Sequence, residues 1–195
     1  MRMAYKEWAV VVDALGRGEQ IIILRKGGIS EGRSGFQIEH DRFFLFPTLF
    51  HQQRESVLPA AQLHYDALAP KLSSDLVRLE FYAEVVDWKF LDSPEAMSQL
   101  RGQHIWREEV AQGRFEWGKS KSIYAMAVRV FRLPRVVELP MRPEYGGCKS
   151  WVDLETIIPT DGAQPALTDG EFAEKLRLFH AALEPSLTLT PSTPP

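Results

Sequence analysis

The chain has 195 residues, of which 45% are hydrophobic and 25% are charged, and it carries a formal net charge of −3. These proportions are ordinary for a globular protein with a core of its own, and the small negative charge excludes a global field that attracts nucleic acid or an anionic membrane. The single cysteine, Cys148, excludes a disulfide within the chain and favours a reducing, cytoplasmic compartment. We expect no secretory signal and no membrane span, because no apolar run reaches the length that either requires.

The predicted elements follow from hydrophobic periodicity and from glycine and proline signals. In chain order we expect a helix over 6–15, strands over 20–26, 36–40 and 43–46, helical structure over 51–69, a strand over 77–85, helices from 93 and over 104–111, strands over 122–133, 136–137 and 148–154, and a helix from 168. Three prolines set boundaries: Pro47 stops a strand, Pro59 breaks or opens a helix, and Pro134 separates two strands.

The strand over 77–85 has the clearest pattern of all. Its residues alternate between apolar and mostly polar types, which places the two sets on opposite faces of a sheet. The inward set is Val77, Leu79, Phe81, Ala83 and Val85, and the outward set is Arg78, Glu80, Tyr82 and Glu84.

Two helix starts carry capping signals. Ser93 precedes Pro94, which suits the first position of a helix. Thr168 and Glu171 match a capping box. An apolar stripe at helical spacing follows the second start: Phe172, Leu176, Phe179 and Leu183.

Strands outnumber helices in this prediction and do not alternate with them regularly. This order argues against a doubly wound parallel sheet. We therefore predict an α+β fold with a mixed, mostly antiparallel sheet, able to curl into a partly closed barrel, and flanking helices. Residues 1–184 are predicted to form a single globular domain, and the Pro-, Ser- and Thr-rich residues 185–195 a disordered tail.

The strand over 20–26 is the segment most clearly shaped by a need beyond folding. Its branched apolar residues run directly into Arg25 and Lys26, followed by Gly27 and Gly28. The exposed amides of a glycine turn together with two cations can bind an anion. The alternative is a hairpin turn whose charged edge residues protect against aggregation.

Charge is unevenly distributed along the chain. Residues 101–150 contain ten lysines and arginines against five acidic residues, whereas residues 151–195 contain two against seven. The basic segment could line an anion site, to which Lys119 and Lys121 would contribute. In the alternative reading, the basic and acidic segments face each other or water.

Two motifs resemble catalytic patterns. Residues 113–120 satisfy the phosphate-loop pattern, but a helix-like stretch precedes them and a strand follows, which is the reverse of the required order, so we expect a surface hairpin turn. Asp87 and Lys89 end a strong strand and resemble half of a magnesium-dependent nuclease core, for which Glu84 or Asp75 could supply a second carboxylate. The alternative there is a solvated strand end.

The five histidines have no spacing that indicates a metal site, and we predict no metal and no cofactor. His40 and His51 flank the aromatic strand over 43–46, so both could approach the turn at Arg25 and Lys26 as phosphate donors or as a base. Structural histidines held by hydrogen bonds are the alternative.

Several blocks of the sequence resemble the bacterial domain of unknown function 1802 family, from residue 5 to about residue 155. The blocks are Lys6 to Val10, Leu24 to Ile29, Phe46 to Thr48 with His51-Gln52, His104 to Trp106, and Gly147 to Val152. The resemblance implies no established activity. The resemblance also hints at nucleic acid, because the family domain is sometimes found fused or linked to restriction-type endonuclease domains. The opening helix and strand are also similar to the start of small pseudobarrels that bind RNA or modified bases, an analogy of fold alone.

Three hypotheses follow. The first is a nucleic-acid- or nucleotide-binding accessory protein without catalysis, whose phosphate-binding residues are Arg25, Lys26, Gly27, Gly28, His40, His51, Lys119 and Lys121. The second is a structural module that binds a protein partner through aromatic surface. The third is a magnesium nuclease that uses Asp87 and Lys89. The sequence indicates no decisive catalytic constellation and no oligomeric state.

Overall fold

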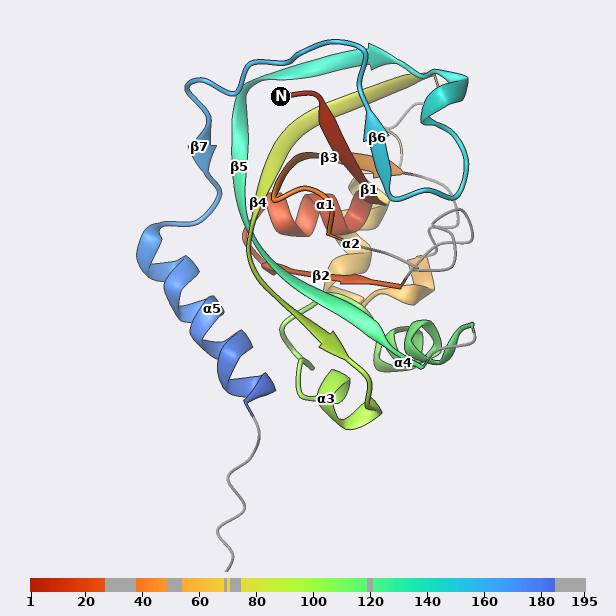
Figure 1. Cartoon of the computed structure of the whole chain (residues 1–195), viewed down its shortest axis with the longest axis vertical. Coiled ribbons are helices and arrows are strands. Elements are labelled where there is room, and N and C mark those ends of the chain that lie inside the picture. Colours follow the sequence, from red (N-terminus) through yellow and green to blue (C-terminus); the bar gives the residue numbers. More distant parts are fainter. Residues whose placement is uncertain (27–37, 49–53, 69, 71–74, 119–120, 185–195) are drawn as a thin grey trace, which may run out of the picture.

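The computed structural model describes residues 1–26, 38–48, 54–68, 70, 75–118 and 121–184. In this part of the chain a mixed sheet curls into a half-barrel around α1, with the other helices at its flanks (Figure 1). In chain order the elements are β1 (Met3–Trp8), α1 (Ala9–Gly16), β2 (Ile22–Arg25), β3 (Arg42–Thr48), the 3-10 helix η2 (Arg54–Ser56), α2 (Pro59–Leu68), β4 (Leu76–Leu91), α3 (Pro94–Ser98), α4 (Glu108–Glu116), β5 (Ile123–Pro140), the 3-10 helix η4 (Pro143–Tyr145), β6 (Trp151–Asp153), β7 (Gln164–Pro165) and α5 (Asp169–Leu183).

The strand order is β2-β5-β4-β3-β1-β6, with β7 added against β5. Among the described strands only β1 and β3 pair in parallel, and all other pairs are antiparallel. The long antiparallel pair of β4 and β5 has two register shifts, between Leu79 and Phe81 and between Val85 and Asp87. Such bulges increase twist and let a strand pair bend. The predicted α+β class and the partly closed, mostly antiparallel sheet are confirmed.

The starts of two helices were predicted correctly from their capping residues. Ala96 N donates to Ser93 Oγ at 3.1 Å at the start of α3. At the start of α5, Glu171 N donates to Thr168 Oγ1 at 3.3 Å and Thr168 N donates to Glu171 Oε2 at 2.9 Å, which completes the predicted capping box. None of the described helices combines the length and the apolar character that a membrane crossing requires.

The prediction of a helix over 6–15 was wrong in its first turn, because residues 6–8 belong to β1. Tyr5 pairs with Leu45 of β3 on one side and with Trp151 of β6 on the other, so ladder hydrogen bonds from both neighbours override the helical spacing. In the same ladder Pro47 pairs with Glu7 and β3 ends only at Thr48, so Pro47 does not stop the strand.

Four further boundaries differ from the prediction. Residues 38–40 are not a strand, and 104–107 precede α4 instead of belonging to it. Residues 136–137 are part of the continuous β5, whose pairing with β4 continues past Pro134 to Pro140. Residues 113–116 lie in α4, so the predicted hairpin turn is wrong there.

The core has two parts. The larger cluster joins α1, β2, the middle of β5, α4 and α5. The smaller cluster lies on the opposite face of the sheet and includes Phe44, Tyr82 and Ile158, whereas their neighbours Phe43 and Phe81 belong to the larger cluster. Tyr82 was predicted to face outward, but it is buried and stacks on Phe131 with 4.8 Å between ring centroids. Residues Leu154 and Ile158 pack in the smaller cluster, so both faces of the sheet are covered.

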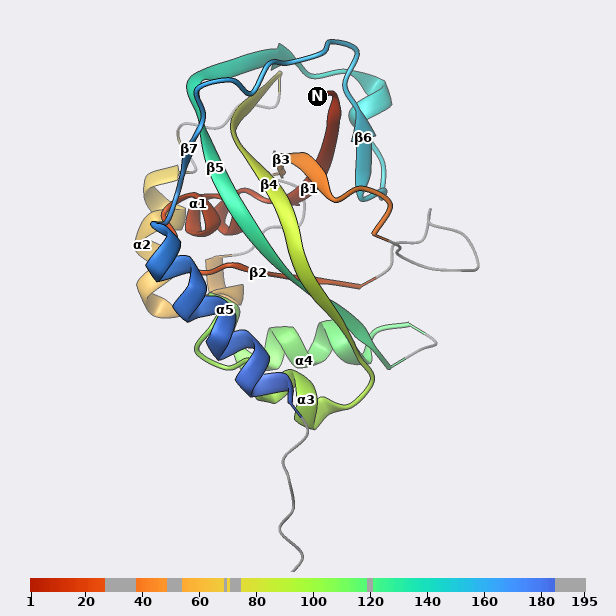
Figure 2. The same ribbon diagram turned by 60° about the vertical axis from the view of Figure 1, so that its left-hand side comes forward.

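α5 lies at the same end of the molecule as α3 and α4 (Figure 2). Its stripe packs on the core as predicted, with Phe172 and Phe179 buried and Leu176 and Leu183 partly buried.

Candidate anion-binding site

The candidate site lies where the two edges of the curled sheet meet. β2 and β6 stand at opposite ends of the strand order, yet Arg25 at the end of β2 reaches Ser150, just before β6. Arg25 Nη2 donates to Ser150 Oγ at 2.5 Å, and the guanidinium lies 5.6 Å from the centroid of the Tyr5 ring on β1. Arg25 therefore spans the seam of the half-barrel.

Further cations gather around this seam from other elements. Lys6 Nζ on β1 donates to Gly147 O at 3.0 Å, and Lys26 Nζ donates to Phe115 O in α4 at 2.7 Å. The Lys149 ammonium donates to the carbonyl of Glu144. The cationic cluster, as we define it, consists of Lys6, Arg25, Arg114 and Lys149.

The electrostatics of Lys6 show how concentrated the positive charge is. Burial, followed by the charge of Lys149, lowers the pKa of Lys6 to about 8; Cys148 opposes this shift, and the charge of Arg25 adds a smaller lowering effect. In the described part of the chain no carboxylate forms an ion pair with Lys6 or Lys149. Like charges in one place disfavour the protonated state, and an anion there would favour it.

A buried carboxylate, Glu7, anchors the inner side of the cluster. Its side chain is 4% exposed, and its Oε1 accepts a hydrogen bond from Trp8 N at 2.7 Å. Burial raises the pKa of Glu7, and the charges of Arg114 and Arg25 oppose this rise.

The Arg114 guanidinium is positioned by two indoles, 3.7 Å from the centroid of the Trp106 ring and 4.8 Å from that of Trp8. Burial lowers the pKa of Arg114, although an arginine stays charged at physiological pH. Contact with both indole rings restricts the guanidinium and so presets its donor geometry.

Aromatic rings line the β6 side of the seam. Trp151 contacts Tyr5 at 5.0 Å and Phe43 at 5.1 Å between ring centroids. The ring of His40 lies 5.0 Å from Trp151 in an edge-on arrangement, so His40 lies beside the seam.

The predicted site residues divide into three groups. Arg25, Lys26 and His40 come together around the seam. Lys121 is exposed just before β5 and makes no described contact with the cluster. The remaining predicted residues lie outside the described part of the chain: Gly27, Gly28, His51 and Lys119.

Sequence reasoning missed Lys6, Glu7, Arg114 and Lys149 as site residues. Lys6, Glu7 and Lys149 do stand in blocks that carry the family resemblance, and Arg114 stands in the segment with the phosphate-loop pattern. That overlap was the available signal, since none of these residues is near Arg25 in the sequence.

Asp87, proposed for a nuclease, is held in an ion-pair network. Its Oδ2 lies 2.9 Å from His180 Nε2 on α5 and 3.3 Å from Lys89 Nζ, and its Oδ1 accepts from Trp88 N at 2.7 Å. Burial opposes ionisation, but hydrogen bonds from Trp88, Lys89 and His180 lower the pKa of Asp87. The proposed second carboxylate, Glu84, pairs with Arg42 at 3.1 Å. The described residues contain no group of three metal-ligating side chains, so this geometry gives the nuclease hypothesis no support.

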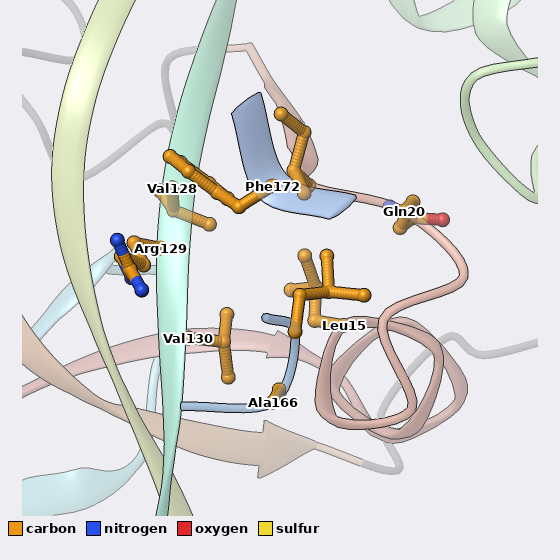
Figure 3. A pocket seen from close by; sticks show the side chains of 9 residues that line it. Leu15, Gln20, Val128, Arg129, Val130, Ala166 and Phe172 are labelled. Carbon is orange, nitrogen blue, oxygen red and sulfur yellow. The ribbon is translucent and has the colours of Figure 1, made fainter. Parts of the chain in front are cut away.

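A cavity elsewhere, between α1, β5 and α5, is lined mainly by apolar side chains such as Leu15, Val130 and Phe172 (Figure 3). The amide of Gln20 is already satisfied, because Nε2 donates to Ile22 O at 2.6 Å and Oε1 accepts from Ile105 N at 3.0 Å. This cavity marks the packing of α5 on the sheet, and the cationic cluster remains the candidate site.

Comparison with known proteins gives a family match and a similar solved structure. A search of the curated proteins finds no match. Among solved structures, the chain is similar to the crystal structure of ASCH from Zymomonas mobilis, with 13% sequence identity over 90% of this chain and 92% of that chain and a TM-score of 0.41. Residues 4–177 match the model of the family described as domain of unknown function 1802, so the resemblance in the sequence blocks is confirmed and the chain belongs to this family.

Proposed function

We propose that the cationic cluster binds phosphate groups of a nucleic acid or nucleotide, and that the protein acts as an accessory protein without catalysis of its own. One observation carries the proposal: four cations, Lys6, Arg25, Arg114 and Lys149, gather at the seam beside the buried carboxylate of Glu7. Arginine and lysine at fixed positions are the residue types that bind phosphate oxygens.

The lowered pKa of Lys6 supports this proposal. Gathering half-buried cations is unfavourable, and proteins retain perturbed groups of this kind most often at functional sites. A phosphate would offset the mutual repulsion of Lys6, Arg25 and Lys149. Because the whole chain is slightly acidic, the attraction would be local to the seam.

The experiment is a salt titration of binding to labelled DNA and RNA oligonucleotides between about 50 and 200 mM salt. Phosphate contacts release counterions, so the affinity of the wild-type chain should fall steeply with ionic strength. Arg25→Gln should weaken binding to all sequences and reduce the salt slope by about 1.

Arg177→Gln provides the matched control, because Arg177 is exposed on α5 and pairs with Glu174 at 2.7 Å. Circular dichroism checks that each variant is folded, and Lys149→Gln repeats the test at a position outside the strands. Absence of salt-sensitive binding in the wild-type chain, or equal weakening by Arg177→Gln, would refute the proposal.

A further inference from the structure

An exposed aromatic patch lies next to the cationic cluster. Trp88 and Phe90 on β4 are 48% and 50% exposed. Both contact Tyr124 on β5, with ring centroids 5.8 Å and 5.1 Å apart, respectively. The aromatic patch is defined by these three residues.

Strand register places the patch beside Arg25. Tyr124 is paired with Phe90 on one side and with Arg25 on the other. Directly opposed residues of antiparallel strands point to the same face of the sheet. Arg25, Tyr124 and Phe90 therefore form one row across β2, β5 and β4, and the aromatic patch is continuous with the cationic cluster.

The helix that packs on β4 does not cover the side chains of Trp88 and Phe90. Asp87 and Lys89, which alternate with the aromatic residues, point to the opposite face of β4. On that face Asp87 contacts His180 of α5, and Leu91 is buried in the core. The helix that covers this end of the sheet thus lies behind Trp88 and Phe90, which face solvent.

We propose that the aromatic patch stacks the bases of a single-stranded nucleic acid whose phosphates bind the cationic cluster. This inference rests on the proposed function and adds the class of nucleic acid. Trp88 and Phe90 are two residues apart on one strand, about 7 Å, so each can stack on a separate base. Unpaired bases are free to stack on aromatic side chains, whereas the bases of a duplex are stacked on each other.

The charge of the cationic cluster favours this ligand over an apolar protein surface. No described carboxylate forms an ion pair with Lys6 or Lys149, so a phosphodiester chain would supply negative charge to the cluster together with planar rings for the aromatic patch.

The test compares single strands with duplexes of the same length by fluorescence anisotropy. We expect a preference for single strands, and about tenfold weaker binding for each of Trp88→Ala and Phe90→Ala. The salt slope should stay at its wild-type value in both variants, because no phosphate contact is removed. Leu63→Ala is the matched control, since Leu63 is 72% exposed on α2, away from the patch.

A second readout follows the indole of Trp88 directly. Oligonucleotide binding should quench tryptophan fluorescence in the wild-type chain. Trp88→Phe should keep most of the affinity and lose that part of the quenching, because phenylalanine still stacks.

The outcomes separate the two proposals. Salt-sensitive binding that Arg25→Gln weakens and the alanine variants leave unchanged would overturn the aromatic inference alone. No nucleic-acid binding at all would overturn both. An oligomer that dissociates in Phe90→Ala would assign the aromatic patch to a second copy of the chain and overturn the inference as well.

Discussion

Lys6 gives the cationic cluster a pH dependence that a simple arginine site lacks. With a pKa of about 8, its ammonium is charged at pH 7 and neutral at pH 9. An anionic ligand binds the charged form, so affinity is complete below this pKa and falls as the pH rises through it. We expect the affinity for oligonucleotides to fall about tenfold between these limits, the cost of losing one charge-assisted contact.

The variant that tests this is Lys6→Arg, because an arginine keeps its charge throughout this range. In this variant the affinity for oligonucleotides should change little between pH 7 and pH 9. Lys175→Arg is the control, because Lys175 on α5 donates to Glu19 O at 3.0 Å away from the cluster, and the affinity of this variant should fall with pH as in the wild-type chain. An unchanged fall of affinity in Lys6→Arg would show that another group titrates.

Two helical glycines are expected to respond to substitution with opposite signs. A Cβ on Gly16, the last residue of α1, would lie 2.2 Å from Cζ of Phe81, whose ring is buried. Gly113 in α4 has no atom within 4 Å of its Cβ position. Gly16→Ala should therefore lower the free energy of unfolding by about 1–3 kcal/mol through overpacking, and Gly113→Ala should raise it by about 0.5–1 kcal/mol.

Denaturant titration of both variants measures this difference. The two substitutions are chemically identical, so helix propensity alone predicts the same sign for both. A stabilised Gly16→Ala would show that the ring of Phe81 can move aside and that α1 packs on β4 less tightly than the contact implies.

At the scale of elements, the sequence predicted best what local chemistry determines. The caps at Ser93 and Thr168 depend on residues a few positions apart, and both were confirmed. The alternation from Val77 to Val85 was wrong in part, because the register shift between Leu79 and Phe81 divides the predicted inward residues between the two core clusters. β1 was missed because its conformation depends on pairing with β3 and β6, far away in the sequence.

The residues of the candidate site also fall into those that local sequence predicts and those that only tertiary structure brings together. Arg25 and Lys26 could be predicted because they end an apolar strand. Lys6 and Arg114 could not, because they approach Arg25 only once the sheet has curled and α4 has packed below β2. Tertiary structure sets that proximity, and no spacing in the sequence encodes it.

At the scale of the whole molecule, the curl of the sheet links fold and site. The contact between Arg25 and Ser150 exists because a strand order that starts at β2 and ends at β6 is bent back on itself. The bulges in β4 let the β4–β5 pair bend, and α5 packs on β5, so both contribute to the curvature that brings the two edges together. Changes that loosen the core should therefore weaken ligand binding as well.

Phe179 tests whether residues 1–184 act as the single domain that the sequence predicts. It is 0% exposed in the core, whereas its neighbour Leu178 is 42% exposed on the same helix. Phe179→Ala should cost about 3–5 kcal/mol, and Leu178→Ala should stay within about 0.5 kcal/mol of the wild-type chain. If α5 belongs to one cooperative unit, thermal unfolding of Phe179→Ala remains a single transition at lower temperature, with helical and aromatic circular dichroism signals changing together. Loss of helical signal ahead of the aromatic signal would instead mean that α5 unfolds from the half-barrel independently, and that the seam is stable without it.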